Sequence, residues 1–537
     1  MQLPELTTTA ELLRTAYDVH ADRDWMRVDG EVLTYADLAE QVQAVEVALV
    51  AAGVEAGDRV ALYLENQARW PVIQYAASSL GAIFVPLNTR YGPRELERVL
   101  DRARPSVLVW GTEVYDRSTL EGLEEMRRRL PWLGTDCQVV LCGPDADAVD
   151  GARSFESFLD VSDAARLRSA VERMEAAVDG HGPAIMSFTS GTTGDPKGAL
   201  LSHRGCILRL FMWTRRIGLR PDDCSILGSP LFWGFGCVMN SYGGPLIGSS
   251  TYMQRRFDPA DFLAAAQSFV THLQGAPTQY ELMLNAAGGG APDLSGLRII
   301  QFGGTGGSAD LVRRLRSAAP NAVFVTSYGL TEGGFVNTWT DPDATEEDLA
   351  TTIGRAGDGN TVAVMELDAD RPVGPGQVGE ICVSGPSVML GYYRPEGGGA
   401  HAGWLRTGDL ATWDEWQEMT IVGRLKDAFR SGNMNIYPEE IEEVLLDHPQ
   451  IAFAAAFDIP DDRLEAVPAA VVVSAELTHD QVAAYIAEQI ADYKRPRRVR
   501  VVDHIDLLPM TPSGKIRKRD LRQAWRDWVT DDTVVGR

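Results

Sequence analysis

Residues 187–198 read Ser187-Phe188-Thr189-Ser190-Gly191-Thr192-Thr193-Gly194-Asp195-Pro196-Lys197-Gly198. The stretch follows an apolar run at 183–186, which predicts a buried strand that ends in a loop. The glycines of this loop allow the backbone to turn tightly with its N–H groups directed inward. Hydroxyls and one ammonium are the side-chain donors that a polyphosphate needs, and here they belong to Thr189, Ser190, Thr192, Thr193 and Lys197. We therefore predict a phosphate-binding loop.

This loop differs from the common phosphate loop of strand-to-helix nucleotide proteins. In that pattern a glycine precedes the lysine and a serine or threonine follows it, whereas Pro196 precedes Lys197 and Gly198 follows it. A surface turn rich in glycine and hydroxyls is the plainer alternative, but the density of donors favours phosphate binding. As a whole, the stretch resembles the signature loop of adenylate-forming enzymes, which comprise acyl- and aryl-CoA ligases, adenylation domains and luciferases. The resemblance implies that Gly191 and Gly194 also lie against the nucleotide.

Length and composition restrict the class of protein. A chain of 537 residues with 45% hydrophobic residues predicts two to four globular domains. The 50 basic and 75 acidic residues give a net charge of −25, which disfavours nucleic acid and anionic membranes as partners. The six cysteines are thinly spread and complete no zinc pattern, so we expect reduced, mostly buried thiols in a cytoplasmic protein. The sequence 1–5 lacks a signal-peptide pattern, and no apolar run reaches the roughly 18 residues of a membrane span.

Strand and helix patterns alternate along the chain. Apolar runs at 58–64, 82–87, 106–110 and 138–141 read as buried strands, and Thr34 is expected to cap a helix. This alternation predicts an α/β fold with layered, largely parallel sheets. Residues 379–385 read as a strand of a smaller, β-rich subdomain. A compact α+β unit is expected near the C-terminus, with a helix opening within 435–442, strands at 452–457, 469–473 and 499–502, and a helix at 480–490.

A second motif follows an apolar strand at 322–326 and reads Tyr328-Gly329-Leu330-Thr331-Glu332. A carboxylate at the end of a strand, beside a glycine-containing turn, is well placed to hold a metal ion at an anionic ligand. The motif resembles a segment of the adenylate-forming family. That resemblance implies that Glu332 binds Mg²⁺, that Thr331 contacts the α-phosphate and that Tyr328 stacks on adenine.

An aromatic segment at 229–236 resembles the lining of the family's acyl pocket, which implies this role for Trp233, Phe235 and Gly236. A buried aromatic cluster of the core is the alternative. Trp233 stands where many relatives carry a histidine that gates the thiol channel. The absence of an acidic residue at 230–242 disfavours an α-amino acid as substrate.

A strand at 297–302 ends in a glycine turn, and Ser308 is expected to cap the helix that follows. Relatives place adenine and the acyl group against this turn, which implies contacts from Gly303, Gly304 and Thr305. Thr305-Gly306 replaces the Ala-Pro of many relatives. This difference either reshapes the acyl pocket or is a neutral loop variation.

The last motifs lie toward the C-terminus. Asp409 follows Thr-Gly in a predicted turn, where its carboxylate suits the two hydroxyls of a ribose, or forms an ordinary Asx-turn. The resemblance implies nucleotide contact by Arg424, a hinge at Lys426, a thiol channel beside Gly432 and a catalytic ammonium at Lys515. It runs to about residue 522 and implies a large N-terminal domain at 1–423 and a mobile C-terminal domain at 424–537.

The family pattern implies an enzyme that activates a carboxylic acid with ATP and Mg²⁺, forming an acyl-AMP and pyrophosphate, and then transfers the acyl group to the thiol of CoA. No Gly-Gly-x-Ser attachment motif follows residue 522, so no appended carrier domain is expected. One alternative is a ligase that loads a separate phosphopantetheinyl carrier protein. Another is ligation to nitrogen, including nitrite activation in diazo formation. A catalytically dead AMP-binding regulator is disfavoured because Lys197, Glu332, Asp409, Arg424 and Lys515 are all present. Relatives are often homodimers.

Overall fold

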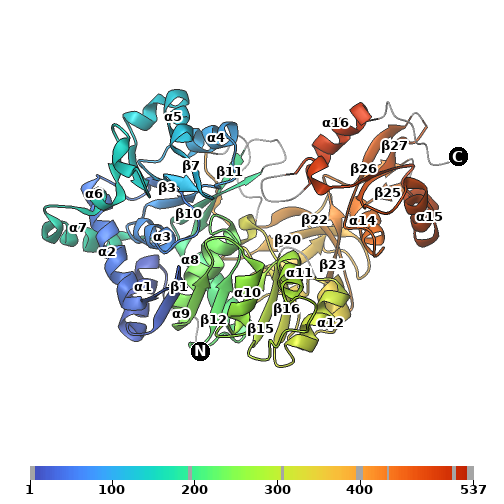
Figure 1. The fold of residues 1–537 in the computed structure, drawn as a ribbon, viewed down its shortest axis with the longest axis horizontal. Helices are drawn as coiled ribbons and strands as arrows, with labels where there is room; N and C mark the ends of the chain where they lie inside the picture. Colours follow the sequence, from blue (N-terminus) through green and yellow to red (C-terminus); the bar gives the residue numbers. More distant parts are fainter. Residues whose placement is uncertain are drawn as a thin grey trace. The chain divides into compact units, whose positions relative to one another are not determined.

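The computed structural model describes residues 6–190, 196–303, 307–394, 403–431, 434–461, 463–510 and 516–528. The chain divides into two compact units, the first formed by 1–362 and 383–405 and the second by 363–382 and 406–537. Figure 1 traces the elements of both units in chain order.

In the first unit, one mixed sheet contains the strand that leads into the phosphate-loop motif. Its strands run in the order β21 (Gly391–Tyr392), β11 (Pro196–Ser202), β10 (Pro183–Ser190), β4 (Ile83–Pro86), β3 (Arg59–Tyr63), β5 (Val107–Gly111), β8 (Gln138–Cys142) and β9 (Arg153–Ser154). The strands from β10 to β9 pair in parallel, as the sequence predicted. By contrast, β10 and β11 form an antiparallel hairpin, and β21 pairs antiparallel with β11.

Both faces of this sheet are buried, which explains its continuous apolar strands. Val60 and Leu62 of β3 pack into one core, and Ala61 and Tyr63 between them pack into another on the opposite face. The first core includes residues of α2 (Tyr35–Ala51), α3 (Arg69–Ser79) and α8 (His203–Arg216). The second includes residues of α4 (Pro93–Ala103) and α5 (Leu120–Arg129). The two-residue period of the strand thus divides its side chains between two helical layers.

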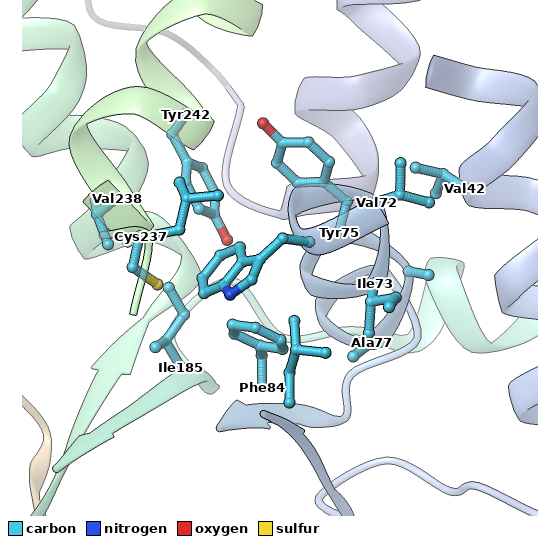
Figure 2. Packing of buried hydrophobic residues seen from close by; sticks show 14 of the residues in the cluster. Val42, Val72, Ile73, Tyr75, Ala77, Phe84, Ile185, Cys237, Val238 and Tyr242 are labelled. Atoms are coloured by element: carbon cyan, nitrogen blue, oxygen red, sulfur yellow. The ribbon is translucent and has the colours of Figure 1, made fainter. Parts of the chain in front are cut away.

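Figure 2 shows the centre of the first core. Ile73 of α3 lies beside Phe84 of β4, whereas the Tyr75 ring of α3 points away from Phe84 and lies beside Tyr242 of α9 (Ser241–Ile247). The rings of Tyr75 and Tyr242 meet edge to face, with centroids 5.9 Å apart. Full burial of an apolar side chain such as Ile73 or Phe84 contributes about 1.5–3 kcal/mol to folding.

The second large sheet of this unit carries the other predicted motifs at the ends of its strands. Its order is β18 (Arg355–Ala356), β17 (Thr338–Trp339), β16 (Val323–Tyr328), β15 (Ile299–Gly303), β14 (His272–Gly275), β12 (Cys224–Leu227), β13 (Ser250–Met253), β1 (Asp24–Val28) and β2 (Glu31–Thr34). The adjacent strands β16, β15, β14 and β12 are parallel. One face is covered by α10 (Pro259–Ala266), α11 (Pro277–Ala286) and α12 (Ala309–Ala318), which share a core with these strands (Figure 1). Parallel strands bring the segments after β12, β15 and β16 to the same edge.

In the second unit, a small sheet runs in the order β19 (Thr361–Met365), β20 (Gly379–Ser384), β22 (Leu405–Trp413) and β23 (Met419–Arg424). The hairpin of β24 (Phe429–Ser431) and β25 (Met434–Ile436) follows. A further sheet contains β26 (Phe453–Asp461), β27 (Glu465–Val473) and β28 (Arg498–Val502). The helices α14 (Pro438–Leu446) and α15 (His479–Gln489) pack into one core with it, and α16 (Lys518–Trp528) packs into another. The α+β unit predicted near the C-terminus is confirmed.

Several local predictions are also confirmed. Thr34 and Ser308 cap α2 and α12, and each side chain accepts a hydrogen bond from the backbone N–H three residues ahead. The six cysteines are buried, and burial raises the pKa of Cys206 to about 12, so that thiol stays protonated at neutral pH. In the part of the chain that the structure describes, no helix combines the length and apolar character needed to cross a bilayer.

One local prediction is wrong. Asp409 lies within β22 and not in a turn, because its backbone pairs with Arg424 of β23. In the aromatic segment, a turn at 231–233 is followed by a π-helix at Phe235–Asn240, which leads into α9.

Candidate active site

The base of the phosphate-loop motif is the β10–β11 hairpin. Thr189 pairs directly with Lys197, and Ser190 pairs with Pro196. Directly opposite residues of an antiparallel pair project from the same face of the sheet, which places the Thr189 hydroxyl and the Lys197 ammonium on one side. The intervening predicted residues Gly191, Thr192, Thr193 and Gly194 lie outside the described residues.

Glu332 lies at the centre of the contacts that join the motifs of the first unit. It belongs to the 3₁₀ turn η4 (Thr331–Gly333), which begins just after β16. The Thr189 hydroxyl donates a hydrogen bond of 2.8 Å to its Oε1. The fold thus joins the phosphate-loop motif to the carboxylate predicted to hold Mg²⁺, across 143 positions of sequence.

Tyr392 of β21 belongs to the same cluster, and sequence reasoning missed it. Its hydroxyl donates to Oε1 of Glu332 at 3.2 Å, and the Lys197 ammonium lies 5.2 Å from the centroid of its ring. Burial and the Glu332 carboxylate raise the pKa of Tyr392 above its usual range, so its hydroxyl remains a donor at neutral pH. A Gly-Tyr pair after a predicted strand was the only local signal of this residue.

The turn after β16 requires a glycine at position 329. A Cβ on Gly329 would collide with the backbone oxygen of Phe335, so only glycine fits there. Tyr328 is buried at the end of β16, and Thr331, which opens η4, is half-buried. Phe335 has φ +79°, a left-handed conformation that is strained for a bulky residue. Strain of this kind persists where the surroundings hold it in place, commonly beside functional sites.

The segments predicted to line the acyl pocket meet at two aromatic rings. The Phe335 ring fills the space that a side chain on Gly234 would need. A Cβ on Gly303, at the end of β15, would lie 3.4 Å from the Phe235 ring. Gly236 has no room for a side chain either, because a Cβ would lie 2.6 Å from the Pro230 carbonyl oxygen. The aromatic segment, the start of the glycine turn and the turn after η4 therefore adjoin one another.

Trp233 is half-buried beside this group. Its ring meets the Phe232 ring edge to face at 5.6 Å, and the Arg90 guanidinium lies 5.7 Å from its centroid. A cation over the face of the indole is a stabilising contact. Gly304 and Thr305 of the glycine turn lie outside the described residues.

In the second unit, the structure joins the two residues predicted to contact the nucleotide. Arg424 Nε lies 2.9 Å from Oδ1 of Asp409, and the Asp409 side chain is only 7% exposed. The adjoining Gly408 N–H donates to Glu380, whose carboxylate also pairs with Arg406 at 2.8 Å. Lys426, the predicted hinge, follows β23 and is exposed. Gly432 and Lys515 lie outside the described residues.

The carboxylate of Glu332 has the donor chemistry that Mg²⁺ requires. Both hydroxyl donors converge on Oε1, and Oε2 has no hydrogen-bond or ion-pair partner among the described residues. A carboxylate oxygen is a hard ligand of the kind that Mg²⁺ prefers. The residues present at this turn therefore fit the ion.

Comparison with known proteins identifies the family. The family model of the AMP-binding enzyme matches residues 13–393, and that of the AMP-binding enzyme C-terminal domain matches residues 440–515. A 3-[(3aS,4S,7aS)-7a-methyl-1,5-dioxo-octahydro-1H-inden-4-yl]propanoyl:CoA ligase of Mycobacterium tuberculosis is 34% identical, over 91% of this chain and 93% of its own length. A feruloyl-CoA synthase of an Amycolatopsis species is 33% identical, over 93% of this chain and 95% of its own length.

The fold agrees with solved structures. The crystal structure of ATP-bound MatB from Rhodopseudomonas palustris superposes with a TM-score of 0.81 and 27% identity, covering 97% of this chain and 99% of that one. The predicted α/β architecture, with a large N-terminal domain and a smaller C-terminal one, is thereby confirmed. The chain belongs to the AMP-binding enzyme family, and the adenylate-forming ligase predicted from the sequence is confirmed.

Proposed function

We propose that the protein is an AMP-forming acid–thiol ligase, which activates a carboxylic acid with ATP and transfers the acyl group to CoA. Relatives that match almost its full length are named as CoA ligases and synthases, which supports CoA as the acceptor. The observation that carries the proposal is the hydrogen bond from Thr189 to Glu332 with Lys197 opposite, because it joins two nucleotide motifs from distant parts of the chain.

In the first half-reaction, a carboxylate oxygen of the acid attacks the α-phosphorus of ATP. The bond between the α-phosphorus and its bridging oxygen breaks, and pyrophosphate leaves. The enzyme has mainly to position the reactants and neutralise the charge that develops between the α- and β-phosphates. Lys197 and the hydroxyls of its loop supply donors to the β- and γ-phosphates, and Thr331 contacts the α-phosphate. Mg²⁺, held by Glu332, would supply positive charge to the phosphate oxygens.

Three residues are proposed to hold the nucleoside. Tyr328 stacks on adenine, and Asp409 accepts hydrogen bonds from the ribose hydroxyls beside Arg424. Lys515 donates to the carboxylate and the α-phosphate. In the second half-reaction, the C-terminal domain, bounded at 424–537, turns about Lys426, and the thiol reaches the acyl-AMP past Gly432. The thiolate attacks the acyl carbon and AMP leaves.

The acyl group is proposed to be apolar. The Phe235 ring beside Gly303 and the Phe335 ring beside Gly234 favour a hydrocarbon or aromatic acid. Polar groups on the acid would lose their hydration there without gaining a partner. Buried thiols are in keeping with a reducing compartment, so we place the enzyme in the cytoplasm.

The test is pyrophosphate exchange with purified protein over a panel of fatty, aryl and amino acids. The product assay then compares CoA with a phosphopantetheinylated carrier protein. We expect exchange with fatty or aryl acids, little with amino acids, and a thioester with CoA. If exchange occurs and the carrier protein is loaded but no CoA thioester forms, the acceptor is a carrier protein and not CoA. Absence of exchange with every acid would overturn the proposed activity.

A further inference from the structure

Tyr392 is held rigidly by backbone pairing on the edge strand of the mixed sheet. It pairs with Ala199 of β11, and Gly391 pairs with Leu200. The backbone N–H groups of Leu390 and Tyr393, on either side, donate to carbonyl oxygens of β11 at 2.8 Å. Since β11 also carries Lys197, the ring and the ammonium are positioned by the same ladder of hydrogen bonds.

The Tyr392 hydroxyl restricts the Glu332 carboxylate. It and the Thr189 hydroxyl approach the same oxygen, at 3.2 and 2.8 Å. Two donors on one oxygen fix the plane of a carboxylate and leave its other oxygen directed away from them. The backbone of Glu332 is held as well, because its carbonyl accepts the Met389 N–H at 2.9 Å. The segment 389–392 therefore holds Glu332 by both its backbone and its side chain.

The Tyr392 ring also contacts the ammonium of the phosphate loop. Lys197 Nζ lies 5.2 Å from the ring centroid, within the range of a cation–π contact. Successive side chains of a strand point to opposite faces. The Tyr393 side chain therefore points to the opposite face, where the guanidinium groups of Arg59 and Arg394 lie 5.9 and 5.2 Å from its ring centroid.

We propose that Tyr392 is a positioning residue of the adenylation reaction. It fixes the distance between the Glu332 carboxylate, which is set for the metal ion, and the Lys197 ammonium, which is set for the phosphates. The inference rests on the proposed function. Its physical basis is that one planar side chain, fixed at its backbone, presents its hydroxyl to the anion and its face to the cation. Binding of the nucleotide then needs less ordering of these two charged groups.

The test uses the full-length protein with Tyr392→Phe, which removes only the hydroxyl, and Tyr392→Leu, which also removes the ring. Tyr393→Phe is the matched control, since it loses a hydroxyl at the next position on the opposite face. ATP binding is measured by calorimetry across a series of Mg²⁺ concentrations and in the absence of metal, and the thermal midpoint is recorded for each variant.

Loss of one hydrogen bond to a charged acceptor predicts that Tyr392→Phe raises the Mg²⁺ concentration at half-maximal binding by about 10-fold. Metal-free ATP binding should stay unchanged in this variant and should weaken in Tyr392→Leu, which loses the contact with Lys197. Tyr393→Phe should match wild type. Suppose that the wild type binds ATP with magnesium and that Tyr392→Phe has the same Mg²⁺ midpoint as Tyr393→Phe. That result would overturn the role of Tyr392 alone. A wild type that binds no ATP would overturn both this role and the proposed function.

Discussion

Replacement of Asp409 by alanine is the sharpest test of the nucleotide site. Its carboxylate is nearly buried, with 7% of the side chain exposed, and Oδ1 pairs with Arg424 at 2.9 Å. The backbone N–H of Asp409 donates to the Thr407 hydroxyl at 3.1 Å, which further fixes the residue. A carboxylate held in this way is oriented before the ribose arrives.

The expected loss follows from the bonds that the carboxylate would make. Each hydrogen bond to a charged group is worth about 1.5–3 kcal/mol. The loss of two ribose hydroxyl bonds should cost at least about 3 kcal/mol, which raises the Kd for ATP on the order of 100-fold. Asp409→Asn keeps one acceptor and should raise it about 10-fold. The fold should lose only about 1 kcal/mol, because Arg424 is half-exposed and water can solvate its guanidinium.

The assay is calorimetric titration with ATP, accompanied by thermal unfolding. Asp414→Asn is the control, because Asp414 is exposed and accepts backbone bonds from Trp416 and Glu418 in the turn between β22 and β23. We expect its ATP affinity to match wild type. Equal ATP affinity of Asp409→Ala and Asp414→Asn would refute the assignment of Asp409 to the ribose.

Three further predictions concern other parts of the chain. Lys515→Ala should lower pyrophosphate exchange on the order of 100- to 1,000-fold with an unchanged thermal midpoint, and a retained rate would remove Lys515 from the mechanism. Gly432→Leu should lower thioester formation far more than exchange, since a side chain would narrow the thiol channel; equal loss of both would argue against the channel. Burial and then the charge of Glu175 raise the pKa of Glu46 well above its usual 4.5. The folded protein therefore keeps a proton that the unfolded chain releases, and its stability should fall as the pH rises above 4.5 toward the folded-state pKa. Glu46→Gln should reduce the difference in melting temperature between about pH 5 and about pH 8, and an unchanged difference would contradict this account.

Local features of the fold were predictable because their causes are local. Apolar runs located β3, β4, β5 and β8, and the side chains of Thr34 and Ser308 marked the starts of their helices. A cap or a two-residue alternation depends on neighbours within a few positions. The π-helix at Phe235–Asn240 was not predictable in this way, since the Phe335 ring from a distant part of the chain lies against Gly234, directly before it.

The amino-acid sequence by itself determined the family, the order of the motifs and the residues that supply donors and carboxylates, because residue type and spacing are written along the chain. Only the tertiary structure decided which of these groups meet. Tyr392 contacts Glu332 across 60 positions, and Thr189 contacts it across 143. Asp409 and Arg424 meet because β22 and β23 pair in one register. Such contacts depend on how strands from separate segments align in a sheet, and no local pattern of residues specifies that alignment.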